Sequence, residues 1–283
     1  MPSVADYVFA GAERLSHGPH PDKALRDAEL LLMRVLGRDR AWMLAYWRDE
    51  IDTGCSIPYH SAIERRRAGE PIQYITGEAE FYGLPFHVNR QVLIPRPETE
   101  HLVEKAIELA AGFARPRIVD VGTGSGAIAV ALARGLPSSI VTAIDLSPAA
   151  LEVAKNNAAR NDVAARIRFL EGDLLAPAAA AQFDMVVSNP PYVPEADRAA
   201  LAVEVRDYEP SQALFAGLDG LDVYRRLIPA AWSALVPGGS IVLEIGYGQR
   251  ESLQALLQAA GFSRIGFTAD LQGIARVVSA QRG

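Results

Sequence analysis

The run Ser188-Asn189-Pro190-Pro191-Tyr192 combines groups that can hold an amino group with a backbone that cannot bend freely. Each proline fixes φ and lacks an N–H group, and a residue before proline is kept out of the helical region. We therefore expect a stiff loop whose Asn189 side-chain carbonyl and Pro190 main-chain carbonyl point in fixed directions. Both carbonyls would accept hydrogen bonds from a substrate NH2 group, so Asn189 and Pro190 are the predicted catalytic residues. Tyr192 would pack on a planar substrate. The predicted substrate-binding residues are Asn189, Pro190, Pro191 and Tyr192, and Asn189 is also a predicted cofactor contact.

Such a pair of acceptors suits methyl transfer to an amide nitrogen. That nitrogen is a poor nucleophile because its lone pair is delocalised into the carbonyl. Two acceptors would orient the NH2 group and stabilise the charge that develops in the transition state. Alignment with an activated methyl group adds a proximity effect of up to about 7 to 11 kcal/mol. No strong general base is required, and the alternative is a diproline loop without a chemical role.

A glycine-rich run precedes the proline loop and follows a predicted strand. Glycines there let a ligand lie against the backbone, although the spacing from Gly122 to Ala127 also fits a dinucleotide fingerprint. A carboxylate at Asp120 favours a cationic ligand group, such as the methionine ammonium of S-adenosylmethionine, over a pyrophosphate. The alternative is a tight turn without a ligand. The run predicts cofactor contacts from Asp120, Gly122, Thr123, Gly124, Ser125 and Gly126.

Two more carboxylates follow the next predicted strands. Asp145 ends the second strand, where a carboxylate can accept hydrogen bonds from both ribose hydroxyls. Capping of the next helix is the alternative role, although Ser147 is better placed for it. Asp173 follows the third strand and could contact the exocyclic amine of adenine, but an aspartate is common in any loop. Since ligands bind at the carboxyl ends of such strands, these positions indicate a nucleoside site.

The elements that must position these residues alternate between strand and helix. This alternation predicts an α/β fold with a mainly parallel sheet and helices on both faces. The predicted strands are residues 118–121, 140–144, 167–170, 183–187, 240–245, 263–267 and 275–280. The predicted helices are residues 98–110, 127–134, 148–160, 221–235 and 251–260.

The first part of the chain has a different pattern, typical of a small helical bundle. Apolar residues recur at helical spacing before Gly37, and we expect Trp42, Leu44 and Trp47 in the bundle core. Residues 81–88 predict two short strands around a Gly/Pro turn. The predicted domains are a helical bundle over 1–70, a β-hairpin linker over 71–95 and a catalytic domain over 96–283.

Composition narrows the class further. Apolar residues make up 49% of the chain and charged residues 22%, which is typical of a globular protein. The net charge of -6 disfavours nucleic-acid binding, and we expect the basic run Arg65-Arg66-Arg67 at a solvated helix end. A single cysteine, Cys55, excludes an intrachain disulfide, and we expect no metal site. Without a leader-like start or a long apolar run, we expect a cytoplasmic protein.

These motifs together resemble the bacterial release factor glutamine methyltransferases, the PrmC/HemK family. The Asn-Pro-Pro-Tyr loop alone occurs in several kinds of amino-methyltransferase, whereas the full set is highly specific. The matching segments keep the family's order over residues 70–280, and the helical N-terminal part fits in size. They are Pro95-Arg96-Pro97-Glu98-Thr99-Glu100, Asp120 to Ala129, Ser188 to Tyr192, Tyr208-Glu209-Pro210 with Ala213-Leu214 and Gly217, and Leu243-Glu244-Ile245-Gly246 with Gln249.

The resemblance implies a class I S-adenosylmethionine-dependent methyltransferase fold, a Rossmann-like sheet with antiparallel pairing at its last strand. It implies S-adenosylhomocysteine as product and N5-methylation of the glutamine in the Gly-Gly-Gln motif of class I peptide chain release factors. By position, Gly122 to Gly126 would line the methionine and ribose, Asp145 would hold the ribose, and Asn189 to Tyr192 would hold the glutamine. Leu174 stands where relatives often have an aromatic residue near adenine, a predicted contact that departs from the family pattern.

The resemblance also implies that the N-terminal helices recognise the substrate protein. We expect a monomer that binds neither nucleic acid nor membrane. Arg96 and Glu98 lie in a family motif, but the sequence gives them no definite role.

Other activities stay open at this point. A sister family that methylates a glutamine of a large-subunit ribosomal protein shares the proline loop. Gly122, where that family tends to have cysteine, favours release factors. An adenine-N6 nucleic-acid methyltransferase must also hold an NH2 group, but it needs a basic cleft and base flipping. A nicotinamide-dependent oxidoreductase would leave Asp120 and the proline loop unexplained, and a non-catalytic scaffold would not need Asn189.

Overall fold

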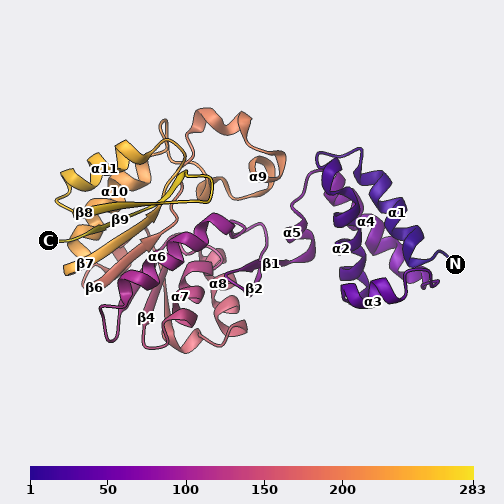
Figure 1. The fold of residues 1–283 in the computed structure, drawn as a ribbon, viewed down its shortest axis with the longest axis horizontal. Helices are drawn as coiled ribbons and strands as arrows, with labels where there is room; N and C mark the ends of the chain where they lie inside the picture. The colour runs from indigo at the N-terminus through magenta and orange to yellow at the C-terminus, as the bar shows by residue number, and fades with distance from the viewer. The chain divides into compact units, whose positions relative to one another are not determined.

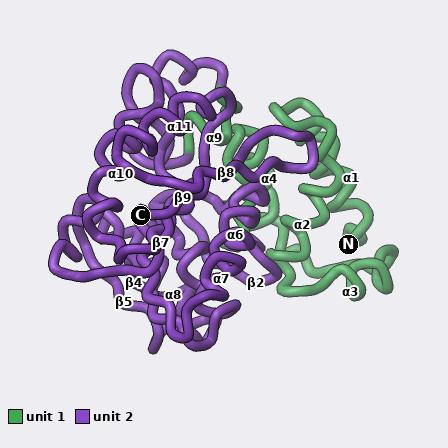
Figure 2. Tube along the Cα trace, turned by 60° about the vertical axis from the view of Figure 1, so that its left-hand side comes forward, with its two compact units in different colours: residues 1–77, 201–208 green, residues 78–200, 209–283 purple.

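The chain forms two compact units. The structure, a computed structural model, describes all residues, 1–283. Unit 1 comprises Met1–Gly77 and Leu201–Tyr208, and unit 2 comprises Glu78–Ala200 and Glu209–Gly283 (Figure 2). The chain therefore enters unit 1 twice, a feature that no pattern in the sequence indicated. No helix combines the length and the apolar character that crossing a bilayer requires.

Unit 2 is built on a seven-stranded sheet (Figure 1). Its strands are β3 (Arg117–Val121), β4 (Ile140–Asp145), β5 (Ile167–Glu171), β6 (Phe183–Ser188), β7 (Leu235–Glu244), β8 (Ser263–Ala269) and β9 (Ala275–Gln281). They lie in the order β5-β4-β3-β6-β7-β9-β8. Strands β3 to β7 pair in parallel, and β9 is antiparallel to both β7 and β8. The predicted α/β fold, including its antiparallel edge, is confirmed.

Helices cover both faces of this sheet. Neighbouring helices α6, α7 and α8 lie on one face, and α10 packs with α11 on the other (Figure 1). Side chains alternate along a strand, so Val119 and Val121 join the core under α10 and α11 while Asp120 points to the opposite face. The same alternation along β7 places Leu243 in that core and Glu244 opposite it. The helices are α6 (Glu100–Ala110), α7 (Ala127–Gly135), α8 (Pro148–Arg160), α10 (Asp222–Ala234) and α11 (Arg250–Ala259).

Strand β7 begins five residues earlier than predicted. Leu235 pairs with Phe183, and a register shift separates that pair from the next one, Met185 with Ser240. Gly238, at φ 78°, lies between the two paired stretches and allows the local turn. The Pro-Gly-Gly sequence interrupts the apolar run of this strand, so the sequence did not predict its first half.

A two-stranded hairpin also belongs to unit 2. Strands β1 (Glu78–Phe81) and β2 (Leu84–His87) pair antiparallel around Tyr82 and Gly83, both at positive φ. Asn157 on α8 fixes the hairpin, because its Oδ1 accepts from the His87 N–H at 2.7 Å and its Nδ2 donates to the His87 carbonyl at 2.9 Å. The predicted strands are present, and the hairpin packs on unit 2.

Unit 1 is a bundle of short helices around one apolar core. Met43 is completely buried there, and Trp42 and Trp47 pack against the core. Leu44 is 62% exposed, so its predicted core position was wrong. A one-residue step around a helix turns a side chain by about 100°, which directs Met43 inward and Leu44 outward. The helices are α1 (Val4–Leu15), α2 (Ala24–Leu36), α3 (Arg40–Ala45), α4 (Ser56–Arg67), α5 (Ile72–Thr76) and, from the second segment, α9 (Val203–Tyr208).

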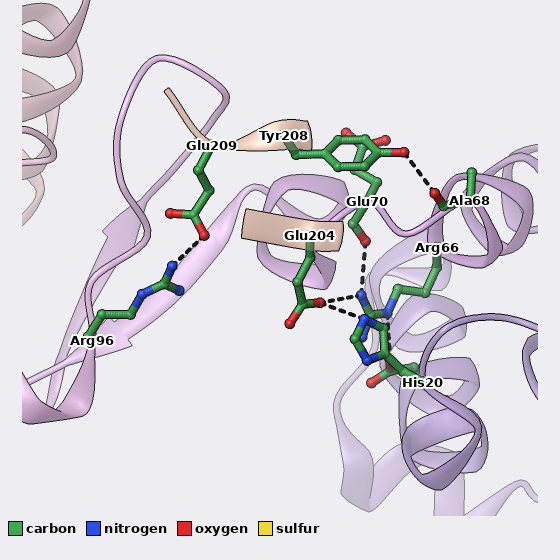
Figure 3. Close-up of polar contacts among 9 residues, drawn as sticks. His20, Arg66, Ala68, Glu70, Arg96, Glu204, Tyr208 and Glu209 are labelled. Carbon is green, nitrogen blue, oxygen red and sulfur yellow. Dashed lines mark hydrogen bonds and ion pairs between the residues drawn. The ribbon is translucent and has the colours of Figure 1, made fainter. Parts of the chain in front are cut away.

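Arg66 binds the returning segment α9 to unit 1 (Figure 3). Its side chain is 3% exposed, and it donates to Asp27 at 2.6 Å and to Glu204 on α9 at 2.9 Å. His20 lies 3.0 Å from the same Glu204 carboxylate, and the Tyr208 hydroxyl donates to a carbonyl of unit 1 at 3.1 Å. The predicted solvation of the basic run was therefore wrong for Arg66, whose neighbours in the run remain exposed.

Candidate active site

The carboxyl ends of the parallel strands border a cavity of about 250 Å³ within unit 2. The structure brings most of the predicted site residues to this cavity, although they come from four different strand ends. Those that line it are Gly122, Thr123, Gly124, Ser125, Asp145, Asp173, Leu174, Asn189 and Pro191. Asp120, Gly126, Pro190 and Tyr192 do not line it.

The glycines after β3 have two different structural roles. Gly122 and Gly124 have φ of +73° and +55°, and a Cβ atom on either would meet no protein atom within 4 Å. Side chains there would project into the space that the loop leaves for a ligand. A Cβ on Gly126 would instead lie 3.0 Å from the Cβ of Ala154 on α8. Gly126 therefore allows close packing against α8. Gly122 and Gly124 leave open space beside the loop, which we call the cradle.

Asp145 braces this glycine loop. One of its carboxylate oxygens accepts from the Gly124 N–H at 2.8 Å and the other from the Ser147 N–H at 2.9 Å. Ser147, not Asp145, caps α8, because its hydroxyl accepts from the Ala150 N–H at 3.2 Å. Each carboxylate oxygen of Asp145 has lone pairs to spare for a ligand hydroxyl at the cavity wall.

Asp120 lies beneath the loop and is completely buried. One carboxylate oxygen accepts from the Thr123 hydroxyl at 2.6 Å, and the other, Oδ1, has no hydrogen-bond partner. Burial raises the pKa of Asp120 to about 7, although the Thr123 hydroxyl and the nearby backbone N–H of Ala129 oppose the shift. A buried carboxylate oxygen without a donor is costly, so a cationic group bound nearby would stabilise it.

The third strand end brings Asp173 and Leu174 to the cavity. Asp173 forms an ion pair with Arg226, a cavity residue that sequence reasoning missed. Leu174 has φ of 50°, which is rare for a side chain of this size. The predicted adenine contacts of these two residues remain predictions.

The proline loop is held at both ends by hydrogen bonds. The Ser188 hydroxyl donates to the Val121 carbonyl at 2.6 Å, and the Gln249 amide donates to the Tyr192 carbonyl at 3.0 Å. Gly220 approaches the loop so closely that a Cβ there would lie 2.2 Å from the Tyr192 oxygen. Between these anchors, no donor of the chain reaches Asn189 Oδ1 or the Pro190 carbonyl, so both remain available as acceptors.

A buried carboxylate lies behind the loop. Glu244, 2% exposed, accepts from the Thr99 hydroxyl at 2.5 Å and from the Tyr192 hydroxyl at 3.2 Å. Thr99 in turn accepts from Asn189 Nδ2 at 3.1 Å. Burial raises the pKa of Glu244 to about 7, and the hydrogen bonds from Thr99 and Tyr192 oppose this shift. Thr99 and Glu244 lie in the segments that carry the family resemblance, but neither had a predicted role.

Arg96, which had no predicted role either, lines the cavity and forms an ion pair with Glu209 (Figure 3). Glu209 also accepts from the Ile94 N–H at 3.3 Å. The pair joins two segments that both contribute to the cavity wall, the one around Arg96 and the one that continues into Pro210. Both segments belong to the motifs that resemble the family, which was the only sequence signal for them.

Known families match both parts of the chain. The family described as the PrmC N-terminal domain matches residues 10–77, and the one described as the methyltransferase small domain matches residues 99–205. Among solved structures, a methyltransferase from Pyrococcus furiosus superimposes with a TM-score of 0.51 over 82% of this chain and 100% of its own, at 16% identity. The hMettl16 catalytic domain, in complex with a MAT2A 3′UTR hairpin, reaches 0.59 over 81% and 82% at 16% identity. These likenesses show the fold.

Sequence relatives are closer. A release factor glutamine methyltransferase from Koribacter versatilis is 47% identical over 252 residues, which cover 89% of each chain. A protein of the same name from Deinococcus radiodurans is 42% identical over 279 residues, 99% of this chain and 98% of its own. With this identity over almost the whole length, the chain belongs to the release factor glutamine methyltransferase family.

Proposed function

We propose that this protein transfers a methyl group from S-adenosylmethionine to N5 of the glutamine in the Gly-Gly-Gln motif of class I peptide chain release factors, leaving S-adenosylhomocysteine. The observation that carries the proposal is the pair of free acceptors, Asn189 Oδ1 and the Pro190 carbonyl, on a braced loop next to a glycine-lined cavity. Its relatives' names point to the same substrate.

The cavity has the features that S-adenosylmethionine needs. Gly122 and Gly124 leave open space where side chains would stand, and Asp145 offers carboxylate lone pairs to ribose hydroxyls. Below the loop, the unpartnered oxygen of Asp120 provides negative charge for the methionine ammonium group. When bound, S-adenosylmethionine supplies an electrophilic methyl group on a sulfonium sulfur.

The chain's own part in the reaction is to orient the glutamine. Asn189 and the Pro190 carbonyl accept from the two N–H groups of the carboxamide and hold its nitrogen toward the cofactor. As the nitrogen forms its bond to the methyl carbon, it becomes positively charged. The two fixed carbonyl dipoles stabilise that charge without reorganising. The nitrogen becomes acidic at the same time, so its proton can leave to water and no strong base is required.

We further propose that unit 1 recognises the substrate protein, that the protein is a monomer, and that it acts in the cytoplasm. The match of residues 10–77 to the PrmC N-terminal domain supports the first point. A single cysteine, compatible with a reducing compartment, supports the last.

The test is methyl transfer to defined substrates. The full chain is incubated with radiolabelled S-adenosylmethionine and, in separate reactions, with a class I release factor, the same factor with glutamate in place of the motif glutamine, a large-subunit ribosomal protein, and DNA. We expect label only in the unaltered release factor, and tandem mass spectrometry should place one methyl group on the motif glutamine. Label in the ribosomal protein or DNA, with none in the release factor, would overturn the proposal.

A further inference from the structure

Burial of the Glu244 carboxylate destabilises the folded protein. Its pKa, raised to about 7 by burial, shows that the folded protein disfavours its charge, and an apolar side chain would avoid that cost. Glu244 is 2% exposed, and both of its carboxylate oxygens already accept from hydroxyls of the chain. What it does contact are two hydroxyls, those of Thr99 and Tyr192, and both connect to the proline loop.

The hydroxyl of Thr99 links Glu244 to Asn189 and fixes the orientation of the Asn189 amide. A threonine hydroxyl has one hydrogen, and an ionised carboxylate can only accept, so that hydrogen points to Glu244. The Thr99 oxygen is then left as an acceptor on its other side. There it meets the amide of Asn189, which must present its NH2 end to Thr99 and its carbonyl end elsewhere.

This choice matters because the two ends of a carboxamide have similar shapes and opposite hydrogen-bonding roles. Asn189 turned by 180° would offer an NH2 group to the NH2 group of the substrate, and the two would repel each other. The backbone loop alone does not select between the two orientations. The side chain of Tyr192, held by the second oxygen of Glu244, braces the other end of the same loop.

We propose that Glu244 and Thr99 are positioning residues, which together set the orientation of the Asn189 amide so that its oxygen faces the substrate nitrogen. The inference rests on the proposed function. It adds that Glu244, 55 positions further along the chain than Asn189, orients the Asn189 carbonyl through the Thr99 hydroxyl. Neither residue needs to touch the substrate for this effect.

Variants of Thr99 provide the first test. Thr99→Val removes the hydroxyl while keeping the shape, so we expect kcat to fall about 10- to 100-fold, with KM for the release factor and Kd for S-adenosylhomocysteine within about threefold. Thr99→Ser restores the hydroxyl and should recover most of kcat. Thr142→Val, the same change at a buried position of β4 away from the loop, should leave kcat unchanged.

Glu244→Gln provides the second test, through the pH dependence of kcat at saturating cofactor. Protonation of Glu244 removes one of its two acceptors, so wild-type kcat should fall as the pH drops through about 7. Glu98, Arg276, Tyr192 and Tyr224 also face Glu244, and Glu98 and Arg276 are the acidic and the basic side chain among them. The amide that replaces the carboxylate in this variant cannot titrate, so its kcat should be low and flat between about pH 6 and about pH 8.

The effect of Asp120 on the pH dependence of kcat must be distinguished from that of Glu244, because the pKa of Asp120 is also raised to about 7. Asp120→Asn should therefore keep the decline of kcat at low pH, although its cofactor affinity changes. Three outcomes would overturn the inference: equal kcat in Thr99→Val and Thr142→Val, no recovery in Thr99→Ser, or a persistent decline in Glu244→Gln. A wild-type protein without any activity on release factors would instead contradict the proposed function.

Discussion

Asn189 offers a single unpaired side-chain oxygen, and one substitution separates its chemical role from cofactor binding. In Asn189→Ala, one of the two proposed acceptors for the substrate is lost, so we expect kcat to fall about 100- to 1,000-fold. The Kd of S-adenosylmethionine, measured by calorimetry, should stay within about twofold. Asn156→Ala, on the exposed face of α8, is the control and should match the wild type. Equal losses in kcat and in cofactor affinity would contradict the role given to Asn189.

Two glycines of one loop allow a matched comparison of ligand binding and packing. An alanine at position 122 pays the cost of positive φ, about 1 to 2 kcal/mol, and its Cβ enters the cradle. Gly122→Ala should therefore weaken S-adenosylmethionine binding by at least about tenfold. Gly126→Ala has a similar cost and also presses on the backbone of Ala154 at 3.1 Å, so its loss of stability should be larger by about 1 to 3 kcal/mol.

Urea unfolding and calorimetry on both glycine variants check this contrast. The assignment of Gly126 to packing fails if Gly122→Ala is the less stable variant. The assignment of Gly122 to the cradle fails if that variant binds the cofactor like the wild type.

At the scale of elements, α9 is held on unit 1 by a buried arginine. Arg66→Met would remove the guanidinium group that contacts the carboxylates of both Asp27 and Glu204, and breaking a buried ion pair in this way costs about 3 to 5 kcal/mol. We expect unit 1 to unfold at lower urea concentration and amide hydrogens of α9 to exchange faster. Arg67→Met, one residue away on the exposed side, should change stability by no more than about 0.5 kcal/mol. Equal effects of the two substitutions would contradict the anchoring role of Arg66.

At the scale of the whole molecule, buried carboxyls make stability depend on pH. The folded-state pKa of Asp120 is about 7, above its ordinary value of 3.8, so the folded protein binds more protons than the unfolded chain between these pH values. The contribution of Asp120 to stability is therefore highest at low pH and declines as the pH rises to about 7. The loss is about 1.4 kcal/mol for each unit of pKa shift.

Asp120→Asn removes this titration. The stability of the variant relative to the wild type should increase by a few kcal/mol as the pH rises from about 4.5 to about 8. Denaturant titrations of the ligand-free protein at a series of pH values measure this difference. A constant difference over the range would mean that Asp120 is ionised in the folded protein at low pH.

The sequence by itself determined the elements and the loops of the candidate active site, because both depend on neighbours along the chain. Apolar runs specified the strands of the parallel sheet, and two prolines stiffened the loop after β6 whatever surrounds it. Parallel pairing then made the strand ends, with Asp145 and Asn189, border one cavity. Local signals were weaker where a strand contains Pro-Gly-Gly, and the first half of β7 was missed for that reason.

Only the tertiary structure decided which distant side chains meet. Thr99 and Glu244 are 145 positions apart in sequence, and their contact depends on the packing of α6 against β7. Arg66 is buried and contacts Glu204 on α9, a segment that returns to unit 1, which no local pattern of charges reveals. Burial and hydrogen-bond partners are properties of the packed chain, so the raised pKa of Asp120 and Glu244 and the orientation of Asn189 follow from the fold as a whole.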